Sequence, residues 1–277
     1  MKSRIITGVV GISLMLIVLL VLPPITLNIV IAALCGIAMY ELLHAAQIKH
    51  LGVTVLSILF AVSTPFLLLA TTPLLAVGVL VIYTALLGFC QVFGHESLKV
   101  EQTGFVYMLS IIAPAALSSM AYFRKFSPEH GLFYIFLALI MAWMCDIGAY
   151  FVGVFFGKHK LCPKISPKKT VEGFVGGIVF DVLLSLLLSY GYQALFAGEG
   201  RVNFPLVAII AFFAAFAGTL GDLTASVLKR ECGIKDYGKI MPGHGGVLDR
   251  FDSVFLTAPL TYLFVEAFGA YFPVIIR

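Results

Sequence analysis

The chain has 277 residues, of which 61% are hydrophobic and only 12% are charged. Soluble domains contain about a quarter charged residues, so this composition excludes a soluble protein and indicates one that crosses a membrane several times. The net charge of +4 is small. It fits anionic lipid headgroups and excludes nucleic acid as a partner, since nucleic-acid binding needs a basic patch. Five scattered cysteines without CxxC spacing argue against zinc and against a disulfide framework.

Nine apolar segments follow one another along the chain, and each is long enough to cross about 30 Å of hydrocarbon as a helix. They are residues 5–22, 25–43, 51–70, 74–93, 104–122, 131–156, 173–196, 204–228 and 253–272. We therefore predict an all-α, polytopic membrane protein with about nine transmembrane helices. The first segment lacks a small-residue cleavage site, so we interpret it as an uncleaved helix and not as a signal peptide.

Lysine and arginine are distributed unevenly between the predicted loops. With the N-terminus in the cytoplasm, inside segments carry 14 of the 18 basic residues and outside segments carry 4. Cytoplasmic loops of membrane proteins are enriched in these residues. This bias predicts that the loops at 157–172 and 229–252 both face the cytoplasm.

We expect three regions along the chain. Residues 1–103 would anchor the protein in the membrane, residues 104–130 would form a connecting helix and loop, and residues 131–277 would carry the catalytic site. Two isolated acids are assigned structural roles. Glu41, near a helix end, is interpreted as an interfacial carboxylate, and Asp181 is interpreted as a helix-packing or interfacial residue.

Charged residues are concentrated between positions 218 and 253. This stretch begins as the end of an apolar helix. On that helix Asp222, Ser226, Lys229 and Arg230 follow at i, i+4, i+7 and i+8, so they share one face. A plain ion pair of Asp222 with Lys229 is the alternative interpretation, but it would require neither the serine nor the aspartates downstream. An acid, a hydroxyl and cations on one face suit a metal ion and phosphates.

A glycine-rich turn follows this helix. Successive backbone amides of Gly245 and Gly246 would form a nest for an anion. His244 either donates a hydrogen bond to a phosphate or caps the turn. Asp249 and Asp252 come next, three residues apart, and would share a face if a helix has begun there.

Two polar features precede this stretch. Asp146 lies deep in an apolar helix, where a carboxylate costs about 2.5–3.5 kcal/mol on insertion scales, so it is a functional candidate. The alternative is a pair with a cation on a neighbouring helix. In the next loop Lys168, Lys169 and Thr170 precede a predicted helix. Cations and a hydroxyl at a helix N-terminus suit an anion, although these lysines also fit the cytoplasmic charge bias.

The polar positions together resemble a known signature. The pattern Ser226-x-x-Lys229-Arg230, then Lys235-Asp236, then Pro242-x-His244-Gly245-Gly246-x-x-Asp249-Arg250-x-Asp252 resembles that of the phosphatidate cytidylyltransferases, the CDP-diacylglycerol synthases. Met241 is a conservative departure, because another apolar residue is usual there. The resemblance extends to residues 145–150 and 166–173. It therefore covers roughly residues 140–255 closely, and the remainder only as hydrophobic helices.

This resemblance implies a reaction in which CTP and phosphatidic acid give CDP-diacylglycerol and pyrophosphate. Asp222 and Asp249 would be Mg²⁺ ligands, and Asp146 and Asp252 would complete an acidic catalytic cluster. Substrate-binding residues would be Lys168, Lys169, Ser226, Lys229, Arg230, Lys235, His244, Gly245, Gly246 and Arg250. The resemblance also implies a second, monovalent cation (K⁺), a homodimer in the lipid bilayer, and a bacterial-type cytoplasmic (inner) membrane with the site facing the cytoplasm.

Two other functions compete with this interpretation. A transporter of a phosphorylated solute would also have intramembrane acids and glycine-broken helices, but it should distribute polar residues over the full membrane depth and in both halves. A CDP-alcohol phosphotransferase would also use aspartates, but its DGxxAR core is absent. A purely structural membrane protein would leave the polar cluster unexplained.

Overall fold

The computed structural model describes residues 2–67, 72–198, 200–240, 245–269, 271 and 273–276. These residues form ten α-helices, one π-helical turn and four short strands. In chain order they are α1 (Lys2–Leu20), α2 (Pro24–Ala45), α3 (Leu51–Leu67), α4 (Pro73–Phe93), α5 (Val100–Phe126), α6 (Gly131–Phe156), β1 (Lys160–Cys162), β2 (Ser166–Thr170), α7 (Val171–Leu195), β3 (Arg201–Val202), α8 (Phe204–Glu231), α9 (Leu248–Phe251), α10 (Val254–Tyr262), the π-turn η1 (Leu263–Ala267) and β4 (Ile275–Ile276).

Six of the described helices, α2 and α4 to α8, are long and apolar enough to cross a membrane. Three shorter apolar helical stretches, Ile6–Leu20, Leu51–Leu67 and Val254–Glu266, coincide with the remaining predicted segments. Many large apolar side chains are exposed on α4, which suits a helix that faces lipid. The all-α fold and the polytopic membrane character are therefore confirmed, and the count of nine spans stays a prediction.

Some element bounds differ from the predicted ones. Helix α5 extends four residues beyond each end of the predicted segment 104–122, because the helical backbone continues through polar residues that hydropathy excludes. The last predicted helix, 253–272, is too long, since helical structure ends at Ala267 and Phe268–Gly269 form a turn. The two antiparallel strand pairs, β1–β2 and β3–β4, were not predicted, because two to five residues are too few for an alternating pattern.

The chain divides into two compact units. The N-terminal unit consists of Met1–Ala121 with Glu231–Phe251, and the C-terminal unit consists of Tyr122–Arg230 with Asp252–Arg277. The signature stretch is thereby shared between them. Most of α8 and the turn at Asp252 belong to the C-terminal unit, and the loop from Glu231 to α9 belongs to the N-terminal unit.

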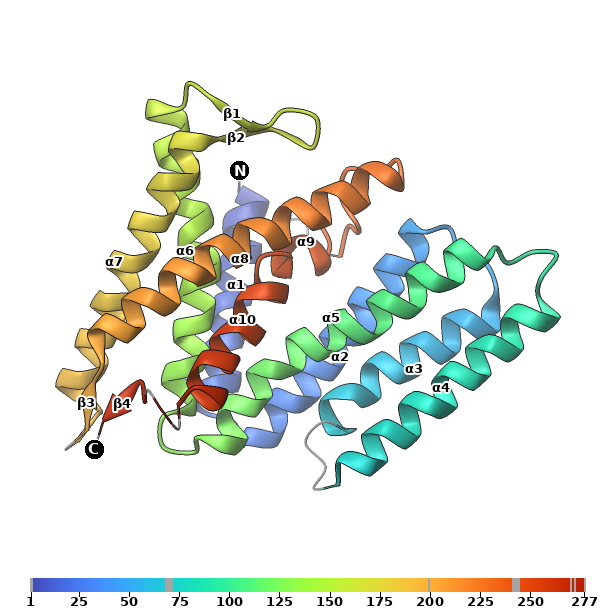
Figure 1. Cartoon of the computed structure of the whole chain (residues 1–277), viewed down its shortest axis with the longest axis horizontal. Coiled ribbons are helices and arrows are strands. Elements are labelled where there is room, and N and C mark those ends of the chain that lie inside the picture. Colours follow the sequence, from blue (N-terminus) through green and yellow to red (C-terminus); the bar gives the residue numbers. More distant parts are fainter. Residues whose placement is uncertain are drawn as a thin grey trace. The chain divides into compact units, whose positions relative to one another are not determined.

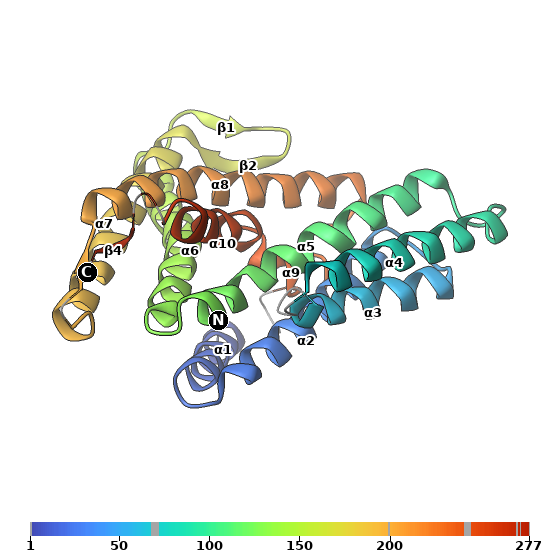
Figure 2. The ribbon, with the colours of Figure 1, turned by 60° about the horizontal axis from the view of Figure 1, so that its bottom comes forward.

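In the C-terminal unit α6 and α7 pack along each other as an antiparallel pair (Figure 1). Glycines let the two backbones approach closely. A Cβ atom on Gly173 would lie 2.6 Å from the Ala149 carbonyl oxygen, and one on Gly177 would lie 2.8 Å from that of Cys145. The β1–β2 hairpin connects the two helices where α6 ends and α7 begins, as the turned view in Figure 2 also shows. This hairpin carries the lysines of the predicted cytoplasmic loop.

In the N-terminal unit α2 to α5 run alongside one another (Figures 1 and 2). A buried polar contact joins three of them. The Tyr83 hydroxyl on α4 donates to the Ser110 hydroxyl on α5 (2.7 Å) and is hydrogen-bonded to the Ser57 hydroxyl on α3 (3.0 Å). Within an apolar environment such a contact satisfies all three hydroxyl groups and sets the register between the helices.

Candidate active site

Three of the predicted acids gather around one lysine in the C-terminal unit. The Lys169 ammonium lies 2.5 Å from Oδ2 of Asp222 and 4.0 Å from Oδ1 of Asp146. The Ser253 hydroxyl donates to Oδ2 of Asp146 at 2.6 Å, and the Ser253 amide donates to Oδ1 of Asp252 at 2.9 Å. We call Asp146, Lys169, Asp222, Asp252 and Ser253 the acidic cluster. The structure thus brings together four predicted site residues from α6, β2, α8 and the turn before α10.

The β1–β2 hairpin decides which lysine enters the acidic cluster. Side chains alternate along a strand, so Lys169 is half-buried while Lys168 beside it is exposed. The Thr170 hydroxyl accepts a hydrogen bond from the Gly173 amide (3.1 Å) and caps α7. Within this structure Lys169 therefore faces carboxylates, and the Thr170 hydroxyl serves the helix cap.

Glycines on α8 let the turn that carries Asp252 approach the helix. A Cβ atom on Gly221 would lie 2.5 Å from the Asp252 carbonyl oxygen, and one on Gly218 would lie 3.0 Å from the Thr257 hydroxyl. A side chain at Gly221 would push the turn away from α8. The glycines near Asp222 are therefore packing positions that bring a second acid close to the first.

The charges of the acidic cluster change the protonation equilibria of its members. Burial and the neighbouring carboxylates of Asp222 and Asp146 raise the pKa of Asp252 to about 7, while Lys229 opposes this shift. Burial lowers the pKa of Lys169, but Asp222 and Asp146 outweigh that effect, so its pKa lies above the usual value. The carboxylates outnumber Lys169, so an additional cation would be attracted to them.

The acidic cluster suits a metal ion only in part. Among the described residues, no three His, Cys, Asp or Glu side chains are grouped so that they alone could hold a metal. Mg²⁺, however, is usually bound by one or two carboxylates together with water and substrate phosphates. The oxygen donors present fit that kind of ion. The expected ligands Asp222 and Asp249 belong to different units, and their joint role stays a prediction.

The signature loop in the N-terminal unit is built around two further carboxylates. We use this name for Tyr237–Gly238 and Gly245–Asp249. Oδ2 of Asp249 accepts hydrogen bonds from the backbone amides of Tyr237 (2.8 Å) and Gly246 (3.0 Å). Glu41, on α2, accepts from the amides of Val247 and Leu248, both at 3.0 Å. Both acids are buried. The interpretation of Glu41 as an interfacial carboxylate is wrong, because the loop covers its carboxylate from a distant part of the chain.

These contacts change the expected role of the glycine-rich turn. The amides of Gly246, Val247 and Leu248 all donate to carboxylates of the chain itself, so in this structure they are not directed at a phosphate. Gly245 has φ of 92°, a left-handed conformation that favours glycine. Its predicted role in binding substrate, like that of Gly246, stays a prediction. His244 lies outside the described residues.

The remaining predicted residues are divided between the two units. Asp222, Ser226, Lys229 and Arg230 all belong to the continuous helix α8, which agrees with the predicted single face. Ser226 and Lys229 are half-buried, whereas Arg230, Lys235 and Arg250 are exposed. The proposed common helix face of Asp249 and Asp252 is not formed, because α9 ends at Phe251 and Asp252 lies in a turn.

Asp181 is fully buried in α7, and among the described residues neither of its carboxylate oxygens has a hydrogen-bond partner. One turn along the same helix, the buried Ser185 hydroxyl also lacks a partner. The position is therefore a packing position and not an interfacial one.

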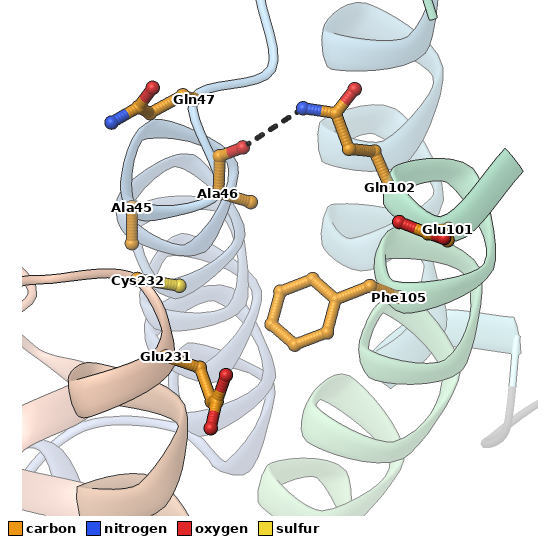
Figure 3. Close-up of a pocket in the computed structure, with 8 residues that line it drawn as sticks. All are labelled: Ala45, Ala46, Gln47, Glu101, Gln102, Phe105, Glu231 and Cys232. Atoms are coloured by element: carbon orange, nitrogen blue, oxygen red, sulfur yellow. Dashed lines mark hydrogen bonds between the residues drawn. The ribbon is translucent and has the colours of Figure 1, made fainter. Parts of the chain in front are cut away.

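A cavity of about 380 Å³ lies in the N-terminal unit at the ends of three elements. Ala45, Ala46 and Gln47 line it from the end of α2, Glu101, Gln102 and Phe105 from the start of α5, and Glu231 and Cys232 from the end of α8. Figure 3 shows the Gln102 amide donating to the Ala46 carbonyl oxygen across its rim (3.5 Å). With two glutamates in its lining, this cavity does not suit phosphates.

Comparison with known proteins identifies the family. The sequence model of the cytidylyltransferase family matches residues 2–268. The chain belongs to the cytidylyltransferase family. Within it, the chain is 32% identical over 274 residues to the phosphatidate cytidylyltransferase of Bacillus subtilis (strain 168), a match that covers 97% of this chain and 99% of that protein.

Other members of the cytidylyltransferase family give the same result. The phosphatidate cytidylyltransferase of Staphylococcus aureus (strain COL) is 33% identical over 263 residues, which cover 94% of this chain and 97% of that protein. That of Staphylococcus saprophyticus is 45% identical over 132 residues, or 48% of each chain. The resemblance seen in the signature residues is therefore confirmed over nearly the whole chain.

Proposed function

We propose that the chain transfers the cytidylyl group of CTP to phosphatidate, giving CDP-diacylglycerol and pyrophosphate for phospholipid biosynthesis. The observation that carries this proposal is the similarity, over nearly full length, to proteins named phosphatidate cytidylyltransferase. The acidic cluster supports it independently, because nucleotidyl transfer depends mainly on positioning and on neutralising phosphate charge, and carboxylates can hold the Mg²⁺ ion that neutralises it.

In this reaction an oxygen of the phosphatidate phosphate attacks the α-phosphorus of CTP, and the bond to the β-phosphate oxygen breaks. Asp222 and Asp249 would hold Mg²⁺, which when bound offsets negative charge on the phosphates and on the leaving pyrophosphate. Asp146 and Asp252 orient the surrounding groups through Ser253 and Lys169, with which they are in contact. Lys229 and Arg230 at the end of α8 bind the phosphates of the two substrates, together with Lys168, Lys235 and Arg250, and Ser226 donates a hydrogen bond.

The meeting point of the two substrates follows from where α8 ends. CTP arrives from water, and the phosphate of phosphatidate lies at the level of the lipid headgroups. Lysine and arginine near a helix end reach this interface, and the helix dipole also favours cations there. We therefore place the transfer near the C-terminal end of α8, with the acyl chains left in the lipid.

The direct test is an assay of the purified chain in detergent with phosphatidate, labelled CTP and Mg²⁺. We expect labelled CDP-diacylglycerol, no product without phosphatidate, and loss of activity with EDTA that Mg²⁺ restores. Adding K⁺ to a K⁺-free assay tests the second cation, and the mass of the purified protein tests the homodimer. Absence of CDP-diacylglycerol under all of these conditions would contradict the proposal.

Orientation is part of the same proposal. We infer nine spans in a bacterial-type inner membrane, with the hairpin and the signature loop in the cytoplasm. Single cysteines replacing Lys168 and Lys239, which are both exposed, should react with a membrane-impermeant reagent only from the cytoplasmic side. The five native cysteines must first be replaced. Labelling of either position from outside intact cells would overturn the nine-span topology.

A further inference from the structure

Glu41 occupies an unusual position for a charged residue. It lies on α2, 206 residues before the first of the amides that it binds, and only 2% of its surface is exposed. Its two oxygens are divided between two partners, since Oε1 accepts from Val247 and Oε2 from Leu248. A buried carboxylate is costly unless its oxygens are hydrogen-bonded. Here the backbone of the signature loop supplies the bonds that make this burial possible.

Two glycines of the signature loop leave the space that the same carboxylate occupies. A Cβ atom on Gly246 would lie 2.5 Å from each of the Glu41 oxygens, and a Cβ atom on Gly238 would collide with Oε1. Neither glycine has a left-handed φ, so the conformation of the backbone does not require glycine at these positions. Glycine is required there because Glu41 occupies the space that a side chain would need.

Asp249 completes this arrangement from within the loop. It accepts from Tyr237 and Gly246, so three successive amides, from Gly246 to Leu248, are bound by the two carboxylates. Hydrogen bonds to a charged acceptor are stronger than neutral ones. The two carboxylates therefore hold the backbone of the loop through its amides. The side chains of the loop are the groups left to meet substrate.

We propose that Glu41 is a positioning residue for the transfer reaction: it holds the backbone of the signature loop so that Asp249 and Arg250 are presented in one arrangement. The kinetic part of this inference rests on the proposed function, whereas the structural part does not. Glu41 touches no reacting atom in this account and acts only through the loop.

The structural part is tested by hydrogen exchange, followed by mass spectrometry, on a peptide that contains Val247 and Leu248. Glu41→Gln replaces one of the two acceptor oxygens with an NH₂ group, which cannot accept the hydrogen bond of a backbone N–H. Glu41→Ala removes both acceptors. In both variants exchange of this peptide should accelerate at least about tenfold, because the protecting hydrogen bonds are lost. Glu96→Gln, an exposed acid in the N-terminal unit, is the matched control and should leave exchange unchanged. Unchanged exchange in both Glu41 variants would overturn the inference.

The kinetic part is tested by a double-mutant cycle between Glu41 and Gly246. Gly246→Ala forces a methyl group against the carboxylate, and we expect kcat to fall at least about tenfold. Because the clash needs Glu41, the double variant Glu41→Ala with Gly246→Ala should be no slower than Glu41→Ala alone. Gly245→Ala is the matched control: its defect comes from φ of 92° and from a Cβ atom that would lie 2.9 Å from Oδ2 of Asp249, and not from Glu41, so Glu41→Ala should add to it and not relieve it.

The outcomes separate this inference from the proposed function. If the wild-type chain makes no CDP-diacylglycerol, the proposed function fails and the exchange experiment still decides whether Glu41 holds the loop. If Glu41→Gln exchanges faster but keeps wild-type kcat and KM, the positioning role is overturned. Multiplicative defects of Glu41→Ala and Gly246→Ala would overturn it as well.

Discussion

The acidic cluster and the signature loop use the same side-chain group for opposite purposes. In the acidic cluster, Asp146 and Asp222 face a cation and are half-buried. In the signature loop, Asp249 and Glu41 face backbone amides and are buried. A carboxylate that water can reach is able to exchange partners with an incoming ion or phosphate. A buried carboxylate that is bound to amides holds the backbone in place. The residue types alone do not reveal this difference.

The largest effects are expected from removing one charge in each region. Asp222→Asn and Asp249→Asn should each lower activity at least about a hundredfold, because each removes a negative charge that would hold the Mg²⁺ ion, and the ion offsets the charge of the phosphates. Only Asp249→Asn should also lower the melting temperature, because the neutral oxygen of an asparagine accepts the hydrogen bonds of Tyr237 and Gly246 more weakly than the carboxylate oxygen does. Steady-state kinetics and thermal unfolding in detergent measure both properties.

Equal behaviour of the two variants would show that the two regions do not differ in this way. Equal loss of stability would mean that Asp222 also serves the architecture. Near-normal turnover in either variant would exclude that residue as a metal ligand.

A second contrast lies within the β1–β2 hairpin. Lys169→Met should reduce activity by about ten- to a hundredfold, because it leaves Asp146 and Asp222 facing each other without the ammonium group between them. Lys168→Met, at the exposed neighbouring position, should reduce the rate at saturating substrate by no more than a few-fold, because the loss of a phosphate contact raises KM and not the rate at saturation. Rate measurements at saturating CTP and phosphatidate compare the two. Equal effects would show that the hairpin contributes only general positive charge.

A smaller effect is expected at the end of α8. Arg230 is exposed there, so Arg230→Ala should raise KM for one of the phosphate substrates by about tenfold while leaving thermal unfolding unchanged. Lys229→Arg should also change KM, because a planar fork and a point charge fit phosphate differently. If both variants keep wild-type KM and kcat, the polar face of α8 is a packing feature and the phosphates bind elsewhere.

The smallest effect on activity is expected from Asp181, a third kind of carboxylate, whose oxygens have no hydrogen-bond partner in the part of the chain that the structure describes. A buried acid without a hydrogen-bond partner destabilises the folded state by about 1–3 kcal/mol. Asp181→Leu should therefore keep normal turnover and melt at the same or a higher temperature. Loss of turnover in a stably folded variant would assign Asp181 to the functional site.

Much of the molecule could be predicted from local patterns. Hydropathy located every long helix to within a few residues, since a helix that crosses lipid must be apolar over about twenty residues. The spacing of Asp222, Ser226, Lys229 and Arg230 placed them on one helix, because 3.6 residues per turn is a property of the backbone itself. The signature residues were sufficient to indicate the family.

What the sequence alone determined are features that depend on neighbours in the chain: apolar length, helical spacing and the order of the signature residues. The partner of each carboxylate depends on the packing of segments that are far apart in the sequence. Glu41 was interpreted as an interfacial carboxylate near a helix end, because its two partners lie more than 200 residues away in the sequence. Asp252 was expected to share a face with Asp249 if a helix had begun there, but it lies in a turn that the missing side chain of Gly221 allows to approach α8. Charge and hydrogen bonding act through space, so the assignment of these acids required the packed helices that bring their partners near.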